Sequence, residues 1–598
     1  MALFVLMAFA VFVPFVHFEV NDDIQMLTAA SGSTTGGTGI PQLMFVSSLF
    51  GRLFVLLYEV TRNIEWYGVF MAIFTLAAVL ALGHVLVAAT AGNSARTRRI
   101  AIVGAIALLA GTLLTMQYTR VGILLAFAGT LLALSDNASA PGRQLGSRWY
   151  VLSGALLILL GFMCRFEAAA LGLLLALPAA ALVMRQPSEW RSTLRRVVLT
   201  AFVAGPLILA HMWLDQRAYA TTGWADGLRY FQTIRPFADY HLHLKVCGTA
   251  DCAHRSGVWS ENDIQLLDDF IYVDSVVFSE KNIDGVATRL FPERTSATWR
   301  LATRLRPLAR ALQLDDANKS PATTGSGDLQ NALREAPNID GAVVAELDAS
   351  QLPVAIVQRI FQGALAYPEF AIFCFMLALA LQLSDRGKRL AILGYVGWVG
   401  LLLAAIYLFT KSPPPWVIRP LWLASATVLM IVALRDMRGD RYRAGERRLV
   451  AVVLTGLLLY IAIIGSKAIL REAAYERSRE EFLTKNLATG PLLVTSLASF
   501  PMESLWRPFG GNASVHAHRW LMLGWMTGTP VHSAQLRNTG ISRPIFSATC
   551  GKESLFLGSE YHAKLFETFT RENGGGECRL TKVEATTLAP IWHGSQVN

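Results

Sequence analysis

The chain has 598 residues, of which 53% are hydrophobic and only 16% are charged. Ordinary soluble domains contain about 25% charged residues, so this composition excludes a disordered chain and argues against a single soluble globule. The net charge of +10 is compatible with nucleic-acid binding or with the Lys- and Arg-rich cytoplasmic loops of a membrane protein. The distribution of basic residues along the chain separates these two classes.

Apolar runs long enough to cross roughly 30 Å of hydrocarbon recur along the chain. The first has neither a basic n-region nor a small-residue cleavage site, so we expect an uncleaved span rather than a signal peptide. The sequence thus predicts an α-helical polytopic membrane protein with about eleven transmembrane helices. The eleven runs are residues 2–19, 66–91, 100–117, 120–135, 149–164, 167–184, 197–213, 368–385, 390–409, 418–435 and 449–466.

Basic residues gather in every second loop. With the N-terminus in the cytoplasm, the five inward loops contain eighteen Lys and Arg residues, against four in the three short outward turns. This positive-inside bias predicts a multi-pass protein of a bacterial inner membrane with its C-terminus in the periplasm. Because topology explains the basic residues, nucleic acid is not expected as a partner.

One shorter apolar segment, residues 43–58, contains Gly51 and Arg52 at its middle. If it crossed the membrane, every later basic loop would lie outside. We therefore expect a helix in the outer membrane interface, within a first outer loop of residues 20–65, with Arg52, Glu59 and Arg62 toward water.

Two long segments, 214–367 and 467–598, are predicted to lie outside the membrane on the same side. The chain then divides into an N-terminal membrane module of seven spans (1–213), a periplasmic loop domain (214–367), a second membrane module of four spans (368–466) and a periplasmic C-terminal domain (467–598). Strand-like runs at 491–497 and 545–549 and a helical pattern near 560–572 predict a small α/β fold for the last part.

Four of the six cysteines fall in these outer segments, as the pairs Cys247/Cys252 and Cys550/Cys578. Two disulfides are expected in an oxidising compartment. The alternative for the first pair is a zinc site, because three histidines lie nearby, but no further ligand pair follows with structural-zinc spacing. These histidines are His241, His243 and His254.

An acidic cluster, Glu19-Val-Asn21-Asp22-Asp23, follows the first span directly. A hydrated helix end is the alternative to a functional role, since Asp and Asn are common where a helix leaves the bilayer. A Gly-rich stretch that we expect to be flexible follows at 31–39. Cationic residues recur at the same outer level of later spans: Arg120, Arg165 beside Glu167, and Lys411 with Arg419.

Carboxylates beside cations suit a reaction on a lipid-linked phosphate. A sugar that leaves a polyprenyl phosphate places negative charge on the phosphate, which Arg, Lys or a metal ion stabilises, and the acceptor hydroxyl needs a carboxylate base. Arg120, Arg165, Lys411 and Arg419 are the candidate phosphate ligands. Asp22 and Asp23 are candidates for the base and for holding a divalent cation, Mg or Mn.

A first span followed at once by an outward acidic motif, an interfacial helix, many spans and a C-terminal outer domain resembles the GT-C superfamily of integral-membrane glycosyltransferases. The resemblance covers the architecture and roughly the first 120 residues. It implies a polyprenyl-phosphate sugar donor, hexosyl or pentosyl transfer to a cell-envelope glycan or lipid-linked acceptor, and a catalytic role for Asp22 or Asp23.

The loop domain adds candidates for acceptor binding or support. Trp259 could offer an aromatic platform to a carbohydrate, whereas Ser260 followed by Asp263 is typical of a helix N-cap. The remaining candidates for this role are Arg52, Glu167, Arg235, Asp239 and Tyr240.

Two other functions share the span count. An O-antigen-type polymerase or ligase would depend on Arg and His residues of the large outer loop rather than on Asp22 and Asp23. A transporter or flippase of lipid-linked glycans predicts ionisable residues near mid-membrane, yet most spans here have apolar centres.

Overall fold

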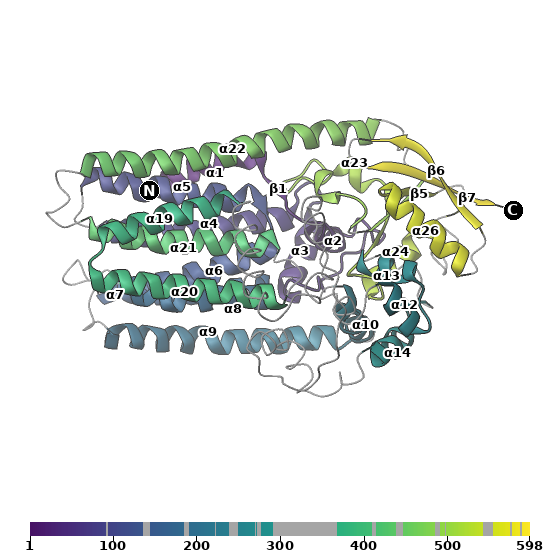
Figure 1. Ribbon diagram of the computed structural model, residues 1–598, viewed down its shortest axis with the longest axis horizontal. Coiled ribbons are helices and arrows are strands. Elements are labelled where there is room, and N and C mark those ends of the chain that lie inside the picture. The colour runs from purple at the N-terminus through teal and green to yellow at the C-terminus, as the bar shows by residue number, and fades with distance from the viewer. Residues whose placement is uncertain are drawn as a thin grey trace, which may run out of the picture.

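The computed structural model describes residues 1–90, 94–135, 144–183, 190–238, 249–290, 367–409, 414–437, 446–484, 491–541 and 550–597, with short gaps at 222, 270, 272–276, 497, 551–553, 574–576 and 587–588. Long helices form a bundle at one end of the molecule, and a smaller α/β unit lies at the other end (Figure 1). The C-terminus lies beyond the sheet of that unit, far from the N-terminus.

Each predicted span contains an apolar helix. Five of these helices, α4, α9, α20, α21 and α22, are long and apolar enough to cross a membrane. That the other six also cross it stays a prediction. The helices are α1 (Ala2–Phe12), α4 (Trp66–Ala89), α5 (Ala95–Leu113), α6 (Tyr118–Leu134), α7 (Gln144–Cys164), α8 (Phe166–Val183), α9 (Trp190–Tyr219), α19 (Pro368–Leu383), α20 (Arg386–Phe409), α21 (Pro415–Asp436) and α22 (Glu446–Thr484).

The outer helices of the bundle expose large apolar side chains, such as Phe202 (77% exposed), Leu209 (67%) and Leu459 (59%). Exposed apolar surface of this kind is unfavourable in water, whereas it is normal on a helix that faces lipid. Inside the bundle, α6 and α7 approach closely, since a Cβ at Gly129 would lie only 2.6 Å from the carbonyl oxygen of Gly154, a typical use of small residues between membrane helices. The chain is therefore a polytopic α-helical membrane protein, as predicted.

The first outer loop forms two helices, α2 (Asn21–Ser31) and α3 (Ser48–Val60), which lie between the bundle and the α/β unit (Figure 1). The helix predicted at 43–58 is thus present, and Arg52, Glu59 and Arg62 are exposed as expected. Gly51 is required here, because a Cβ would lie 1.8 Å from the carbonyl oxygen of Pro41. The position of α3 in the membrane interface stays a prediction.

The Gly-rich stretch forms a tight turn after α2. Helix α2 ends at Gly32 in the left-handed conformation (φ +76°), where glycine is the residue of lowest cost. The chain then reverses, so that the Gly37 N–H donates to the Gly32 carbonyl oxygen at 2.8 Å. The glycines permit this tight turn, and the flexibility of the stretch stays a prediction.

The C-terminal unit is built on a five-stranded sheet, with strand order β4-β3-β5-β7-β6. Strand β3 pairs in parallel with β4 and β5, and β7 pairs antiparallel with β5 and β6. Its elements are β3 (Leu492–Ser496), η4 (Met502–Ser504), α23 (Ala513–His516), β4 (Arg519–Leu523), α24 (Pro530–Thr539), β5 (Ser554–Leu557), α26 (Glu560–Glu572), β6 (Glu577–Ala585) and β7 (Pro590–Val597). At 39 residues, α22 is about 58 Å long, and its final turns extend from the bundle to this sheet (Figure 1).

The described part of segment 214–367 packs directly on this C-terminal unit. It forms α10 (Trp224–Ala238), α12 (Thr249–Ser256), α13 (Glu261–Asp268) and α14 (Glu280–Leu290). Their apolar side chains share one hydrophobic core with the sheet and α26, and the rings of Phe278 and Phe569 stack at 5.8 Å. Two segments that share a core must lie on the same side of the membrane. Which side that is stays a prediction.

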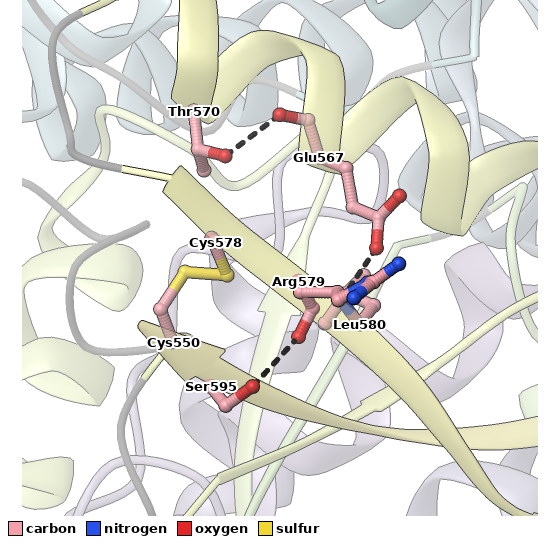
Figure 2. Close-up of a disulfide and its surroundings, with 7 residues drawn as sticks. All are labelled: Cys550, Glu567, Thr570, Cys578, Arg579, Leu580 and Ser595. Atoms are coloured by element: carbon pink, nitrogen blue, oxygen red, sulfur yellow. Dashed lines mark hydrogen bonds between the residues drawn. A yellow bond between two sulfur atoms is a disulfide. The ribbon is translucent and has the colours of Figure 1, made fainter. Parts of the chain in front are cut away.

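One predicted disulfide is present. Cys550 and Cys578 are bonded, with Cα atoms 5.8 Å apart, at the start of β6 (Figure 2). Cys252 is also disulfide-bonded, but Cys247, its predicted partner, lies outside the described residues. His241 and His243, which with His254 would serve the alternative zinc site, lie outside them as well.

Candidate functional site

The acidic cluster begins at a short pairing of two chain segments. Strand β1 (His17–Phe18) pairs in parallel with β2 (Thr115–Met116), and the Glu19 N–H donates to the Met116 carbonyl oxygen at 2.9 Å. This pairing fixes the chain that leaves α1 against the turn between α5 and α6. Residues 19–23 therefore lie at the first turn of α6, where Tyr118 and Arg120 are found.

Glu19 takes part in a buried network of four charges, which we call the ion-pair network. It pairs with Arg120 and, at 3.2 Å, with Arg419, while Arg419 also pairs with Glu369 at 2.7 Å. The exposed fractions of the two arginine side chains are 1% for Arg120 and 13% for Arg419, and Glu369 is fully buried. Two cations and two carboxylates balance each other, and Arg120 also donates to the Thr115 carbonyl oxygen at 2.7 Å. These contacts join β1, α6, α19 and α21.

The two aspartates of the cluster differ in their environment. Asp23 is fully buried and accepts a hydrogen bond from the Tyr67 hydroxyl at 2.6 Å. Burial raises the pKa of Asp23 well above its ordinary value, the Tyr67 hydrogen bond opposes this, and the neighbouring charge of Asp22 adds to it. Burial therefore favours the neutral form of Asp23. Asp22, one residue earlier on α2, is only half-buried, so part of this residue is exposed to solvent.

Arg165 contacts the first turn of α6, the same turn that contains Arg120. The Arg165 guanidinium donates to the Tyr118 hydroxyl at 2.8 Å and to Thr119 Oγ1 at 2.9 Å, and lies over the rings of Phe45 and Tyr118 at 5.3 and 5.2 Å. Its side chain is 22% exposed, and the 69% exposed Glu167 lies 3.6 Å away. The Tyr118 backbone N–H hydrogen-bonds the Asp23 carboxylate, and Asp22 and Arg165 lie near the same tyrosine. We call Asp22, Tyr118 and Arg165 the half-open site.

An aromatic cluster borders this site. Phe45 stacks on Tyr118 with ring centroids 5.7 Å apart, and also contacts Trp525 and Phe231. Trp525 follows β4, so the C-terminal unit contributes to the surroundings of Arg165. The preceding residue, Met44, has a positive φ of +70°, a strained conformation for a residue other than glycine, and its N–H donates to the Tyr219 hydroxyl at 2.7 Å.

The structure therefore separates the candidates that the sequence grouped together. Arg120 and Arg419 are held in the ion-pair network, whereas Arg165 lies near the two aspartates.

Trp259 is 3% exposed and packs in the hydrophobic core beside Phe237 and Phe278, so its surface does not offer a platform to a ligand in this conformation. Ser260 caps α13 in a full capping box, as its spacing predicted. Lys411, Asp239, Tyr240 and the side chain of Arg235 lie outside the described residues.

The sequence did not identify Phe45, Tyr67, Trp525 or Glu369 as parts of this region. Tyr67 and Glu369 each occupy the first turn of an apolar helix, which is where polar groups of later spans meet the first outer loop. That position was a usable signal. Glu369 pairs with Arg419, 50 residues away in the chain, and no pattern in the sequence indicates this pairing.

A metal ion fits the described residues poorly. Among them, no group of three or more His, Cys, Asp and Glu side chains lies together. Of the two carboxylates proposed to hold a cation, Asp23 is buried and favoured in its neutral form, which is a weak ligand because metal coordination requires the ionised carboxylate.

Two solved structures are similar to this chain over nearly its whole length, both crystal structures of ArnT from Cupriavidus metallidurans. The apo structure is 12% identical, covers 99% of this chain and 97% of that chain, and has a TM-score of 0.36. The structure bound to undecaprenyl phosphate is 12% identical, covers 98% and 96%, and has a TM-score of 0.35. No protein-family model and no curated protein matches the chain. At such TM-scores the similarity assigns no role to any side chain, so the roles below depend on the contacts themselves.

Proposed function

We propose that this protein is a GT-C-type membrane glycosyltransferase. It transfers a hexosyl or pentosyl group from a polyprenyl-phosphate donor to a cell-envelope glycan or lipid-linked acceptor at the periplasmic face of a bacterial inner membrane. The observation that carries the proposal is the half-open site, where a half-buried acidic residue, Asp22, and a partly exposed guanidinium, Arg165, lie near the same tyrosine at one end of the helix bundle.

In the proposed reaction, Asp22 accepts the proton of the acceptor hydroxyl while the acceptor oxygen forms a bond to the anomeric carbon of the sugar. The bond between that carbon and the phosphate oxygen breaks, and the leaving polyprenyl phosphate keeps the electron pair. Arg165 stabilises the charge that develops on the phosphate, for which its planar fork is well suited. Tyr118 and Phe45 hold the guanidinium in place.

The other predicted residues have more limited proposed roles. Lys411 is proposed as a second phosphate ligand, and Arg52, Glu167, Arg235, Asp239 and Tyr240 as acceptor contacts or support. Arg120 and Arg419 are proposed to hold the helix ends that border the site, because their charges are already balanced by carboxylates. No step passes through a metal ion, so transfer in EDTA is expected to proceed at the full rate. Loss of transfer in EDTA and its recovery with Mg²⁺ or Mn²⁺ would instead support a cation held at Asp22.

A transporter is less well supported by the position of the buried charges. Arg120, Glu369 and Arg419 lie within the first five residues of α6, α19 and α21, near the helix ends rather than at mid-membrane, where a transport pathway would use them. A polymerase or ligase differs in that its activity would survive loss of Asp22.

The proposal is tested with purified protein in nanodiscs and a polyprenyl-phosphate sugar. Arg165→Ala should lower the affinity for polyprenyl phosphate by at least about 10-fold, since a charge-assisted contact to phosphate contributes roughly 1.5–3 kcal/mol. The matched control is Arg229→Ala, because Arg229 is an exposed arginine on α10 that pairs with Asp226. Equal affinity of both variants and the wild type would contradict the proposed donor site.

A further inference from the structure

The carboxyl ends of the parallel strands of the C-terminal sheet face the acidic cluster. Strand β3 lies between β4 and β5 and runs parallel to both, so the chain moves to opposite sides of β3 when it forms the two neighbours. In open α/β sheets, such a switch point leaves a crevice at the carboxyl ends of the strands, and ligands bind there.

In this protein, α2 occupies that position. Gln25 of α2 donates to the Leu523 carbonyl oxygen, at the end of β4, at 3.5 Å. Around the end of β3, the side chains of α2 and of the sheet meet without space for a water molecule. The residues that enclose this position are Asn21, Gln25, Thr495, Ser496, Met502 and Met522.

Asn21 makes the most specific contacts of this junction. Its Nδ2 donates to the Phe500 carbonyl oxygen at 2.9 Å, and its Oδ1 accepts from the Glu503 N–H at 3.1 Å. Both partners belong to the segment that follows β3, more than 475 residues later in the chain. The side-chain amide thus forms two hydrogen bonds to backbone groups of the C-terminal unit, directly before Asp22.

We propose that Asn21 is a positioning residue for the transfer reaction, through which the C-terminal unit fixes the orientation of the Asp22 carboxylate at the half-open site. This inference rests on the proposed function, because it concerns the residue that acts as base. A misplacement of about 1 Å can lower a rate about 10²-fold. Two hydrogen bonds to one amide are enough to set the rotation of the first turn of α2.

Other contacts hold the same two parts of the molecule together without involving Asn21. Glu65, after α3, accepts from Asn512 and from the His516 ring, each at 2.8 Å, and Gln535 of α24 donates to Thr34 Oγ1 at 3.3 Å. Loss of the Asn21 contacts should therefore leave the C-terminal unit docked. The expected effect is on the rate of transfer rather than on folding or donor binding.

The test compares Asn21→Ala with Asn573→Ala, a control that removes an asparagine hydrogen bond to the Phe569 carbonyl oxygen within the C-terminal unit. For Asn21→Ala, we expect kcat to fall about 10- to 100-fold with the KM for the donor unchanged, and amide hydrogen exchange over residues 21–31 to become faster. The control should change neither quantity.

If Asn21→Ala folds poorly, Asn21→Asp is used, which keeps an acceptor for the Glu503 N–H and adds a negative charge beside Asp22. This variant loses the hydrogen bond to the Phe500 carbonyl oxygen, so the same fall in kcat and the same faster exchange over residues 21–31 are expected.

The outcomes separate this inference from the proposed function. If Asp22→Asn is inactive but Asn21→Ala keeps kcat within about two-fold of the wild type, with unchanged exchange over α2, the positioning role is wrong and the proposed function stands. If Asp22→Asn is fully active, both are wrong. A fall in kcat with unchanged exchange over residues 21–31 would also overturn the positioning role, because Asn21 would then act without fixing α2.

Discussion

Two groups of charged side chains lie at the same end of the helix bundle and differ in burial. The ion-pair network of Glu19, Arg120, Glu369 and Arg419 contains equal numbers of both charges and is almost closed to solvent. In the half-open site, Asp22 is half-buried and Arg165 is 22% exposed. Sequence position makes the arginines of both groups look alike. The comparison shows that an arginine's position in the sequence does not reveal its role. Its burial and its charge partners distinguish an arginine that holds helices together from one that can bind a substrate.

The largest effect on folding is expected at the ion-pair network. Arg419→Ala leaves Glu369 buried without its cation, and breaking a buried pair by removal of one partner costs about 3–5 kcal/mol. Size-exclusion chromatography and thermal unfolding should therefore show little folded protein. Arg419→Ala combined with Glu369→Gln should recover most of the loss, because the stranded charge is then removed.

Arg229→Ala is the matched control for this experiment, as an exposed ion pair contributes at most about 1 kcal/mol. If Arg419→Ala has normal stability but has lost affinity for polyprenyl phosphate, then Arg419 does not serve to hold the helices together. It would instead belong to the donor site.

A smaller effect on folding is expected from the disulfide, which joins Cys550 to Cys578 within the C-terminal unit (Figure 2). Replacing Cys550 and Cys578 by alanine should destabilise this unit by about 2–4 kcal/mol, while transfer at low temperature stays near the wild-type rate. Limited proteolysis of residues 491–597 measures the destabilisation of the C-terminal unit. Cys374→Ala, at an exposed free cysteine of α19, is the control, and equal protease resistance of both variants would contradict a stabilising role for the disulfide.

The smallest effect concerns Glu503, whose backbone N–H contacts Asn21. Burial raises the pKa of Glu503 from 4.5 to about 7, against the opposing effects of its own backbone N–H and of Arg471. The folded state thus binds the proton more tightly than the unfolded state. The stabilisation is complete below about pH 4.5 and is lost as pH rises to about 7, a loss on the order of 1–3 kcal/mol.

Glu503→Gln imitates the protonated form and should remove this dependence. Thermal unfolding of the variant and of the wild type between pH 4.5 and 8 measures it, with the variant more stable at pH 8. Parallel pH profiles for the two proteins would show that Glu503 does not titrate in this range.

Much of the membrane architecture could be predicted, because each helix that meets lipid leaves a continuous apolar run in the sequence. The acidic cluster after the first span was also predictable from its position. The residues that pair with the members of this cluster could not be predicted. Glu19 and Arg419 are 400 residues apart, and their pairing follows from the packing of α1, α19 and α21 rather than from local pattern. Likewise, Trp259 was proposed as a binding surface because aromatic composition does not reveal which rings face a core.

The most direct test of the central claim is a side-by-side measurement of the transfer rate for Asp22→Asn and Asp23→Asn, at equal amounts of folded protein. Asp22→Asn removes the proposed base and should lower the rate on the order of 10²–10⁴-fold. Asp23→Asn keeps an acceptor for the Tyr67 hydroxyl and replaces a carboxyl whose neutral form is favoured by burial, so its rate should stay within about 10-fold of the wild type. A rate for Asp22→Asn near that of the wild type, or inactivation by Asp23→Asn alone, would contradict the assignment of the half-open site as the centre of the reaction.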